Sequence, residues 1–291
     1  MFTKRQSLRQ MSFYLLLLPF VLWIGLLLII PQMSIVWLSF QERIGNGQTE
    51  FSLLQYQNLF GSTVYNYTLW RTVWMSVLAT GLTLVICWPV ALYISKVAQG
   101  RSKTALYLSC LLPFWIGELV RVLGWMIILR ETGLISWVLL HLHIIDQPIE
   151  FLYRDITLMS GLIYTSMLFM IVPLVSVLES LDDAQIEAGY DLGGNGWIVL
   201  WKIIIPHAKP GIVSGCIIVF MLNLGNYLTP SMLGGKSAQW FTELIYSQFI
   251  TRFNWEFGAA FGVVLLLTST LIVWMGLRLT GQSLSRTMGG V

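Results

Sequence analysis

The stretch Glu-Ala-Gly-Tyr-Asp-Leu-Gly at residues 187–193, followed nine residues later by Ile-Ile-Ile-Pro at 203–206, decides how this chain is interpreted. Both pieces belong to a polar, glycine-containing segment, residues 180–209. Apolar runs flank it at 156–178 and 210–233, and each is long enough to cross a bilayer, which takes roughly 20 apolar residues. A polar segment in that position must lie in water or against another protein.

The composition is that of a membrane protein. Hydrophobic residues make up 56% of the chain and charged residues only 11%, with a mean hydropathy of +0.73, which lies outside the range of soluble domains. The net charge of +3 gives no reason to expect nucleic acid as a partner. Cys87, Cys110 and Cys216 lie in apolar runs without metal-ligand spacing, so we expect packing residues and no metal site.

Six apolar runs predict six membrane-spanning helices in one all-α polytopic domain, residues 12–280. The runs cover residues 12–40, 72–95, 104–129, 156–178, 210–233 and 257–277. The fifth is expected to bend or end early, because it contains Gly225 and Pro230. The first is too long for the apolar core of a signal peptide and is predicted to be a retained helix.

The placement of Lys and Arg predicts that both termini face the cytoplasm, together with residues 180–209. Positive residues gather in the N-terminal segment 1–11, between the second and third spans, in 180–209 and after the sixth span. The other loops have fewer positive residues or balance them with Asp and Glu. The N-terminal segment 1–11 and the tail 281–291 are therefore predicted to be cytoplasmic.

Within residues 180–209 the sequence predicts a short helix, a glycine turn and a second helix. Asp182 or Asp183 suits a helix N-cap, where free amides and the helix dipole favour a carboxylate. Gly189 and Gly193 permit a tight turn and close backbone contact. Pro206, with Pro210 after it, is expected to stop the segment before the fifth span. An ordinary amphipathic loop on the membrane surface is the alternative interpretation.

On these residues the chain resembles the permease subunits of type I ABC importers, most closely the spermidine/putrescine branch. Further stretches that carry the resemblance are Leu112-Pro113-Phe114-Trp115, Leu119-Val120-Arg121, Leu224-Gly225-Asn226-Tyr227-Leu228-Thr229-Pro230 and Trp255-Glu256-Phe257-Gly258-Ala259-Ala260. It covers essentially the whole chain. It implies the six-helix fold of these permeases in the bacterial inner membrane. The family pattern often has Ala at Gly189 and Leu at Ile205, and both differences are small.

The resemblance also implies how the chain works with its partners. The ATPase-coupling residues would be Glu187, Ala188, Gly189, Asp191, Gly193 and Pro206. The chain would be no enzyme and would bind no cofactor, since ATP and Mg lie on a partner ATPase. The expected partners are a second, similar but non-identical permease chain, a cytoplasmic ATPase dimer, a periplasmic solute-binding protein and the lipid bilayer, with no nucleic acid.

Polar and aromatic residues inside the spans are the candidates for the substrate pathway: Glu118, Arg121, Trp88, Trp115, Asn223, Asn226 and Tyr227. Glu118 and Arg121 are three residues apart and share a helix face. They form either an ion pair that fixes helix packing, or a site where Glu118 meets a cationic solute. The asparagines either join helices by hydrogen bonds or line the pathway, and the tryptophans either pack or form cation–π walls.

The predicted solute is a polyamine such as putrescine or spermidine. The family pattern often has an acidic residue at the position of Asn226, so an amino acid or related small amine stays an alternative. An ion-gradient-driven secondary transporter is less favoured, because no inverted repeat is visible, and catalytic motifs are absent. For the outer loop 231–256, which contains apolar residues at helical spacing, three roles stay open: lying on the membrane surface, packing between protomers and docking a binding protein.

Overall fold

The computed structural model describes residues 16–44, 48–235 and 239–281. The predicted N-terminal segment 1–11 and all of the tail beyond residue 281 lie outside these ranges. The described chain forms two compact units, which are residues up to 65 with 244–267, and residues 66–243 with those from 268 onward.

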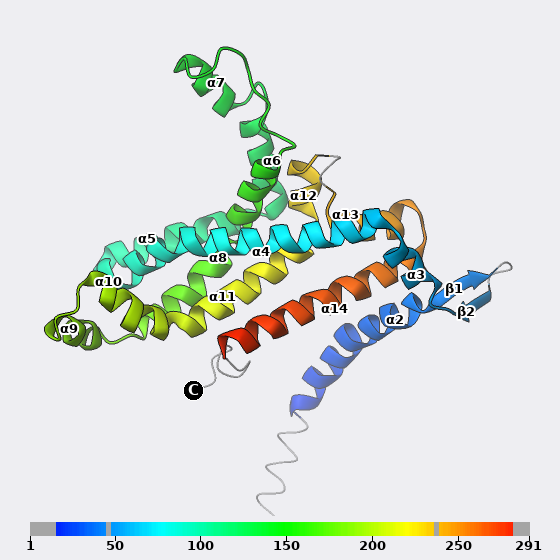
Figure 1. Ribbon diagram of the computed structural model, residues 1–291, viewed down its shortest axis with the longest axis horizontal. Helices are drawn as coiled ribbons and strands as arrows, with labels where there is room; N and C mark the ends of the chain where they lie inside the picture. Colours follow the sequence, from blue (N-terminus) through cyan, green and yellow to red (C-terminus); the bar gives the residue numbers. More distant parts are fainter. Residues whose placement is uncertain (1–15, 45–47, 236–238, 282–291) are drawn as a thin grey trace, which may run out of the picture. The chain divides into compact units, whose positions relative to one another are not determined.

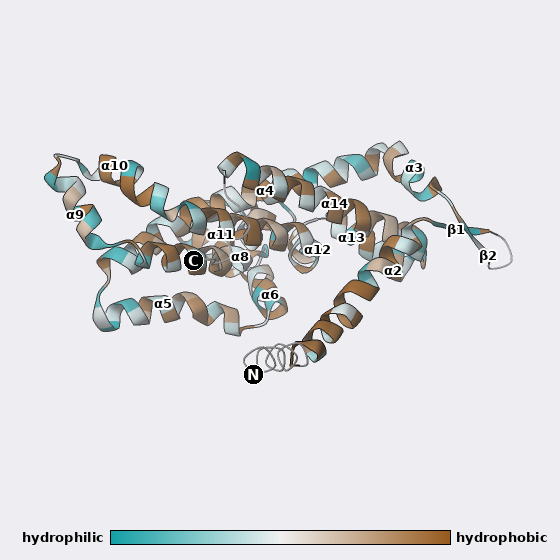
Figure 2. Cartoon of the chain, turned by 90° about the horizontal axis from the view of Figure 1, so that it is seen from below, coloured by the Kyte–Doolittle hydropathy of each residue, from teal (hydrophilic) through white to brown (hydrophobic). Residues whose placement is uncertain are grey.

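Six helices in the described ranges are long and apolar enough to cross a membrane: Leu16–Ser39, Thr63–Val97, Glu118–His141, Asp155–Glu179, Gly196–Gly225 and Trp255–Thr280. This confirms the predicted number of membrane helices and the helical fold class. Figure 2 shows hydrophobic residues along α2 and α14, and hydrophilic residues on α9 and on the strands β1 and β2.

In the first unit, a π-helical turn, η1 (Gly25–Ile29), leads into α2 (Ile30–Ser39). The strands β1 (Gln41–Ile44) and β2 (Gln48–Phe51) pair antiparallel, with Gln41 opposite Phe51, and α3 (Leu54–Gly61) follows. The turn η4 (Ser247–Thr251) and the first half of α14 (Trp255–Thr280) complete this unit. An ion pair of 3.2 Å between Arg43 Nη2 and Glu256 Oε1 joins the hairpin to the start of α14.

The second unit holds most of the helices, in the chain order shown in Figure 1. They are α4 (Thr63–Leu92), η2 (Tyr93–Val97), α5 (Gly100–Trp115), α6 (Glu118–Leu129), α7 (Leu134–His141), α8 (Asp155–Glu179), α9 (Asp183–Asp191), α10 (Gly196–Val199), η3 (Leu200–Ile204), α11 (Ile205–Gly225), α12 (Leu228–Leu233) and the start of α13 (Phe241–Tyr246).

The helices α8 and α11 lie side by side (Figure 1) and form the centre of this unit. Glycines on α11 allow the close approach: a Cβ atom on Gly211 would lie 2.8 Å from the Pro173 carbonyl oxygen, and one on Gly215 would lie 2.8 Å from Met170 Sδ. Small residues commonly permit such contacts between membrane helices. The adjoining core includes Cys87 of α4, which is buried, as its place in an apolar run predicted.

Gly211→Ala is expected to destabilise the protein relative to the control Gly81→Ala by about 1–3 kcal/mol, the usual cost of overpacking a tight interface. Gly81 is also inside a helix, but a Cβ atom on it would meet nothing within 4 Å beyond its own helix, so the control removes the difference in helix propensity. The measurement is the thermal unfolding midpoint of the detergent-solubilised protein. Equal midpoints for the two variants would contradict the close contact of α8 and α11.

Two of the predicted spans are built differently from the continuous helices that hydropathy suggests. The third predicted span, 104–129, is divided: α5 ends at Trp115, Ile116 is extended, and α6 starts at Glu118. The candidate membrane helix here runs over Glu118–His141, so it shares only residues 118–129 with the predicted span. Pro113 in the last turn of α5 and Gly117 at the break disfavour a continuous helix. The fifth, 210–233, starts earlier and ends at Gly225, where the sequence predicted a bend, and α12 follows.

Candidate functional site

Two helix breaks in the second unit border one polar cavity. The break between α5 and α6 and the break between α11 and α12 both contribute to its wall, with side chains of α8 between them. The cavity has a volume of about 580 Å³ and is lined by Phe114, Ile116, Gly117, Glu118, Arg121, Thr165, Ser166, Phe169, Leu222, Asn223, Gly225, Asn226, Tyr227 and Leu228. Within a membrane, interrupted helices are tolerated only where the freed backbone is buried in protein or lines a cavity.

Glu118 is held at the edge of this cavity by the second break. Its Oε1 accepts hydrogen bonds from Asn226 Nδ2 at 2.8 Å and from Thr229 Oγ1 at 3.2 Å. Asn226 in turn accepts a bond from the Thr229 backbone N–H through Oδ1, at 3.0 Å. Glu118 is also the first residue of α6, where the helix dipole favours a negative charge. These contacts orient the carboxylate and offset part of its desolvation.

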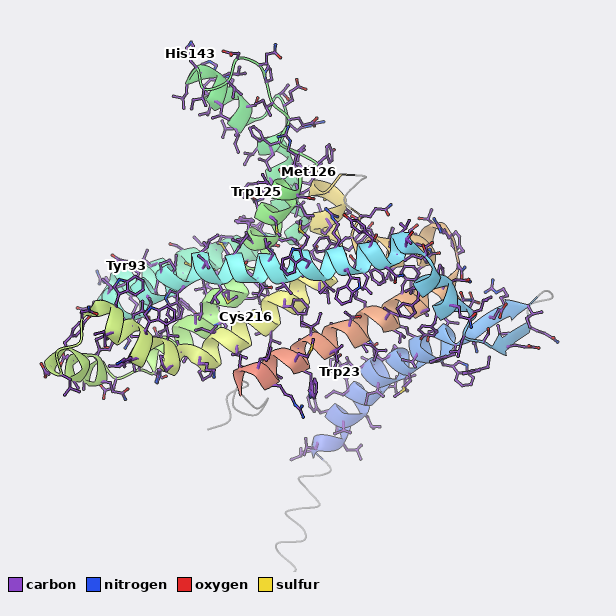
Figure 3. The ribbon with its side chains drawn as sticks, viewed as in Figure 1. Trp23, Tyr93, Trp125, Met126, His143 and Cys216 are labelled. Atoms are coloured by element: carbon purple, nitrogen blue, oxygen red, sulfur yellow. The ribbon has the colours of Figure 1, made fainter. Side chains whose placement is uncertain are left out.

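Arg121 does not neutralise Glu118. None of the ion pairs in the described part of the chain includes either residue. Instead the guanidinium carbon of Arg121 lies 5.9 Å from the centre of the Tyr164 ring, and its buried Nε has no hydrogen-bond partner. The ion-pair interpretation is therefore not supported. The Tyr164 ring also meets that of Trp125, labelled in Figure 3, in an edge-on contact with centres 5.7 Å apart.

Five of the seven predicted pathway residues border the cavity, and the two tryptophans do not. Asn223 is only 1% exposed, and its side-chain nitrogen has no partner in the described structure; Tyr227 stands beside the α11–α12 break. Trp88 packs against the core cluster around Cys87, as the packing alternative predicted. Trp115, at the end of α5, is 82% exposed.

Sequence reasoning missed several polar groups of the site. Thr165 and Ser166 come from the middle of α8, and only their polarity within an apolar run distinguishes them. Thr229, which holds Glu118, lies in a stretch that the sequence singled out without giving this residue a role. Its contact depends on α12 folding back beside α6, a relation with no local signal in the sequence.

The segment 180–209 contains a helix with a well-formed cap at each end. Asp182 is the N-cap of α9, and its Oδ1 accepts the Ala184 backbone N–H at 3.0 Å. At the other end Gly193 has φ +80°. Gly193 N–H donates to the Tyr190 carbonyl at 2.9 Å, and Gly194 N–H donates to the Gly189 carbonyl at 3.0 Å. This is the Schellman arrangement, which requires a left-handed residue at the position of Gly193.

Gly189 allows α9 to pack closely against α10 and η3. A Cβ atom on Gly189 would lie 2.5 Å from Ile203 Cδ1 and 3.3 Å from Val199 Cγ2. Beyond α9, Asn195 caps α10 by accepting the Ile198 N–H at 2.9 Å. The predicted pattern of helix, glycine turn and helix is therefore present in the structure.

The prediction that Pro206 and Pro210 stop this segment before the membrane helix is wrong. One helical run extends over Gly196–Gly225. Pro206 falls in the first turn of α11, directly after the π-helical turn η3, and Pro210 lies inside α11. Pro206 therefore lies inside a longer helical run, one residue after Ile205, whose N–H bonds to the Leu200 carbonyl five residues back. This irregular π-helical bonding accommodates a proline that a regular α-helix interior would disfavour.

Most residues of α9 are exposed. Glu187, Ala188 and Asp191 are exposed. Large apolar residues lie exposed beside them: Leu192, at 89%, together with Trp197 and Trp201. Exposed apolar residues beside charged ones are common in protein–protein contacts, and Leu192 directly follows Asp191.

Six membrane helices, a polar cavity between broken helices and an exposed polar segment define a membrane transport component. The chain belongs to the family of binding-protein-dependent transport system inner membrane components, whose family model matches residues 2–280. It is 32% identical over 258 residues to the spermidine/putrescine transport system permease protein PotB of Haemophilus influenzae, covering 88% of this chain and 90% of that protein. The corresponding PotB of Escherichia coli is 31% identical over 265 residues, 89% of this chain and 96% of its own length.

Solved structures agree on the fold. A bacterial ABC transporter involved in the import of the acidic polysaccharide alginate has a chain that matches with a TM-score of 0.73 at 18% identity, over 96% of this chain and 98% of that chain. The MetNI methionine ABC transporter matches with a TM-score of 0.53 at 19% identity, over 74% and 93%. The predicted ABC importer permease fold is thus confirmed.

Membership of this family settles the general role. The chain is a multi-pass protein of the bacterial inner membrane and a permease component of an ABC importer. Such components are not enzymes and carry no cofactor of their own, as the resemblance implied. The chain functions in a transporter complex that depends on a binding protein; an alginate transporter of this fold has been solved in complex with its periplasmic protein.

Proposed function

We propose that this chain forms half of the translocation pathway of an ATP-driven importer for a polyamine such as putrescine or spermidine. The observation that carries the solute assignment is the Glu118 carboxylate, oriented at a cavity between membrane helices. It is supported by the names of the relatives, which are spermidine/putrescine permeases matched over 90% or more of their length.

Placing the charged side chain of Glu118 in a membrane helix costs free energy, which suggests that the residue has a function. A charged side chain in a membrane helix costs up to about 2.5–3.5 kcal/mol at the centre of the helix on insertion scales. For Glu118, at the first residue of α6, hydrogen bonds from Asn226 and Thr229 offset part of whatever cost its position carries. A cationic amine that enters the cavity offsets the remainder. The aromatic side chains of Phe114 and Phe169 on the cavity wall offer further favourable contacts to an ammonium group.

The family pattern often has an acidic residue at the position of Asn226, and asparagine there has a different role. Its amide is engaged with Glu118 and Thr229, so it orients the carboxylate instead of adding a second one. Arg121 adds a positive charge to the wall. The pathway therefore attracts cations only moderately, which favours passage of the solute over its retention.

We further propose that residues 180–209 form the coupling loop, which docks on the cytoplasmic ATPase. Its support is the capped helix α9, the exposed residues Glu187, Ala188 and Asp191, and its predicted cytoplasmic side. The assembly would contain a second, non-identical permease chain, two ATPase subunits and a periplasmic solute-binding protein. ATP binding closes the ATPase pair, draws both coupling loops together and rocks the permease halves from inward-open to outward-open.

The solute is tested by competition in proteoliposomes that hold the assembled transporter. We expect uptake of labelled putrescine to be suppressed by excess spermidine and unaffected by arginine or glutamine. The alternative solute class, an amino acid or related small amine, has Arg121 in its favour, because a guanidinium on the cavity wall is suited to bind a carboxylate. Suppression by arginine with no effect of spermidine would support that class and contradict the polyamine proposal.

A further inference from the structure

A partly buried lysine at the end of the second membrane helix contacts the junction at which the proposed coupling loop begins. Lys96 lies in η2, the π-helical turn that ends this helix and starts at Tyr93, labelled in Figure 3. Its Nζ donates to the Leu181 carbonyl oxygen at 2.5 Å and to Asp183 Oδ1 at 2.7 Å. The Lys96 side chain is 14% exposed, although that of Asp183 is 76% exposed.

The two acceptors lie on the two sides of a helix junction. Leu181 follows the end of α8, where carbonyl groups lack helical partners and a cation is favourable. Asp183 is the first residue of α9. A single ammonium group therefore joins the C-terminus of α8 to the N-terminus of α9 and ties both to η2.

The other contacts of α9 connect it to helices other than the second membrane helix. The chain itself links α9 to α8, and the Gly189 contact with Ile203 links it to η3 and so to α11. A second ion pair in this region, Lys103 with Glu179 at 2.8 Å, comes from α5 and is much more exposed on the lysine side, at 36%. Ala91 and Ile94 also pack against Leu174 and Leu178 at the end of α8. Of the two ion pairs in this region, the one made by Lys96 ties the start of α9 to the second membrane helix.

We propose that Lys96 is a positioning residue for energy coupling: by locking the α8–α9 joint to η2, it makes displacement of the coupling loop move the second membrane helix together with α8 and α11. The inference rests on the proposed role of residues 180–209. A push on α9 from the ATPase would otherwise bend the short junction at residues 180–182 and be lost before it reached the second helix.

The test is the number of ATP molecules hydrolysed per labelled putrescine imported, measured in proteoliposomes with the assembled transporter. Lys96→Gln keeps a hydrogen-bond donor but removes the charge. We expect this ratio to rise about fivefold, the factor that corresponds to losing about 1 kcal/mol of ion-pair energy. Lys103→Gln, which removes the more exposed ion pair, is the matched control and should leave the ratio unchanged.

Two more variants separate coupling from simple structural damage. Lys96→Arg preserves the charge and should restore most of the coupling. Asp183→Asn removes the other partner at an exposed position, and the double variant Lys96→Gln with Asp183→Asn should be no worse than the more affected single one, because the two residues act through one contact. If Lys96→Gln fails to accumulate in the membrane, Asp183→Asn reports on the same contact.

The results for these variants separate the role of Lys96 from the proposed docking of residues 180–209 on the ATPase. A normal ratio in both Lys96→Gln and Asp183→Asn overturns the role of Lys96. If Glu187→Lys in the coupling loop also transports normally, the docking proposal itself fails. Loss of transport in Glu187→Lys with normal coupling in Lys96→Gln rejects only the inference about the lysine.

Discussion

Uptake of labelled spermidine is expected to fall to background in Glu187→Lys, while the chain still inserts and accumulates in the membrane. Glu187 is exposed on α9, so it can meet a partner surface, and reversing its charge would place a lysine in the proposed contact with the ATPase. Like-charge contacts across an interface cost several kcal/mol. ATP hydrolysis by the complex should no longer respond to the solute-loaded binding protein.

Gln185→Lys is the control for this variant. Gln185 is also exposed on α9, but two residues away and hence on the opposite side of the helix. It should retain most of the uptake. Unchanged uptake in Glu187→Lys would remove the basis for assigning residues 180–209 to the ATPase contact.

Substitutions at Gly193 test whether the backbone conformation of the same loop matters, without changing its charge. The φ of +80° at Gly193 costs a residue with a Cβ atom about 1–2 kcal/mol, and a bulky side chain would also disturb the exposed surface beside Leu192. Gly193→Val should therefore abolish uptake. Gly193→Asn should keep most of it, since asparagine tolerates the left-handed conformation. Equal loss in both variants would show that backbone conformation is not what the position requires.

The second large effect is expected at Glu118. Glu118→Gln should reduce putrescine uptake roughly 10-fold to 100-fold, the range that corresponds to losing a charge-assisted hydrogen bond worth about 1.5–3 kcal/mol. Glutamine still accepts the bonds from Asn226 and Thr229, so the α6–α12 contact should persist. The measurement is the initial rate of uptake at equal amounts of assembled complex.

Glu131→Gln is the matched control, because Glu131 is exposed in the turn between α6 and α7 and does not line the cavity. It should leave uptake unchanged. Poor accumulation of Glu118→Gln, with equal loss for every solute transported, would instead make Glu118 a packing residue. Thr229→Val offers a further check, since it removes one donor to Glu118 without changing the charge of the cavity.

The features that the sequence predicted correctly are those set by residues close together in the chain. The N-cap at Asp182 and the left-handed turn at Gly193 follow from neighbouring backbone groups, and six apolar runs suffice for six membrane helices. The division of the third span at Gly117 was not predicted, because hydropathy averages over a break that leaves the apolar run intact. The prediction for Pro206 was wrong because the π-helical turn η3 directly before it lets the proline lie inside a longer helical run, and the sequence gives no sign of that irregular turn.

The contacts that sequence could not predict join residues far apart in the chain. Lys96 meets Asp183 only because η2 packs beside the end of α8. Glu118 meets Thr229 only because two broken helices end at one cavity. Neither the positions of these residues nor their types indicates the partner. Helix packing therefore determines which polar groups become a site and which side chains, like Trp88, pack against the core.

The most direct test of the account is the energy source of uptake in proteoliposomes that contain this chain and its partner permease. With the ATPase, the binding protein and enclosed ATP present, labelled spermidine should accumulate even after ionophores remove the proton and sodium gradients. Without the ATPase, no accumulation should occur at any imposed gradient. Gradient-driven accumulation of spermidine by vesicles that lack the ATPase would contradict the central claim that this chain is the membrane half of an ATP-driven pump.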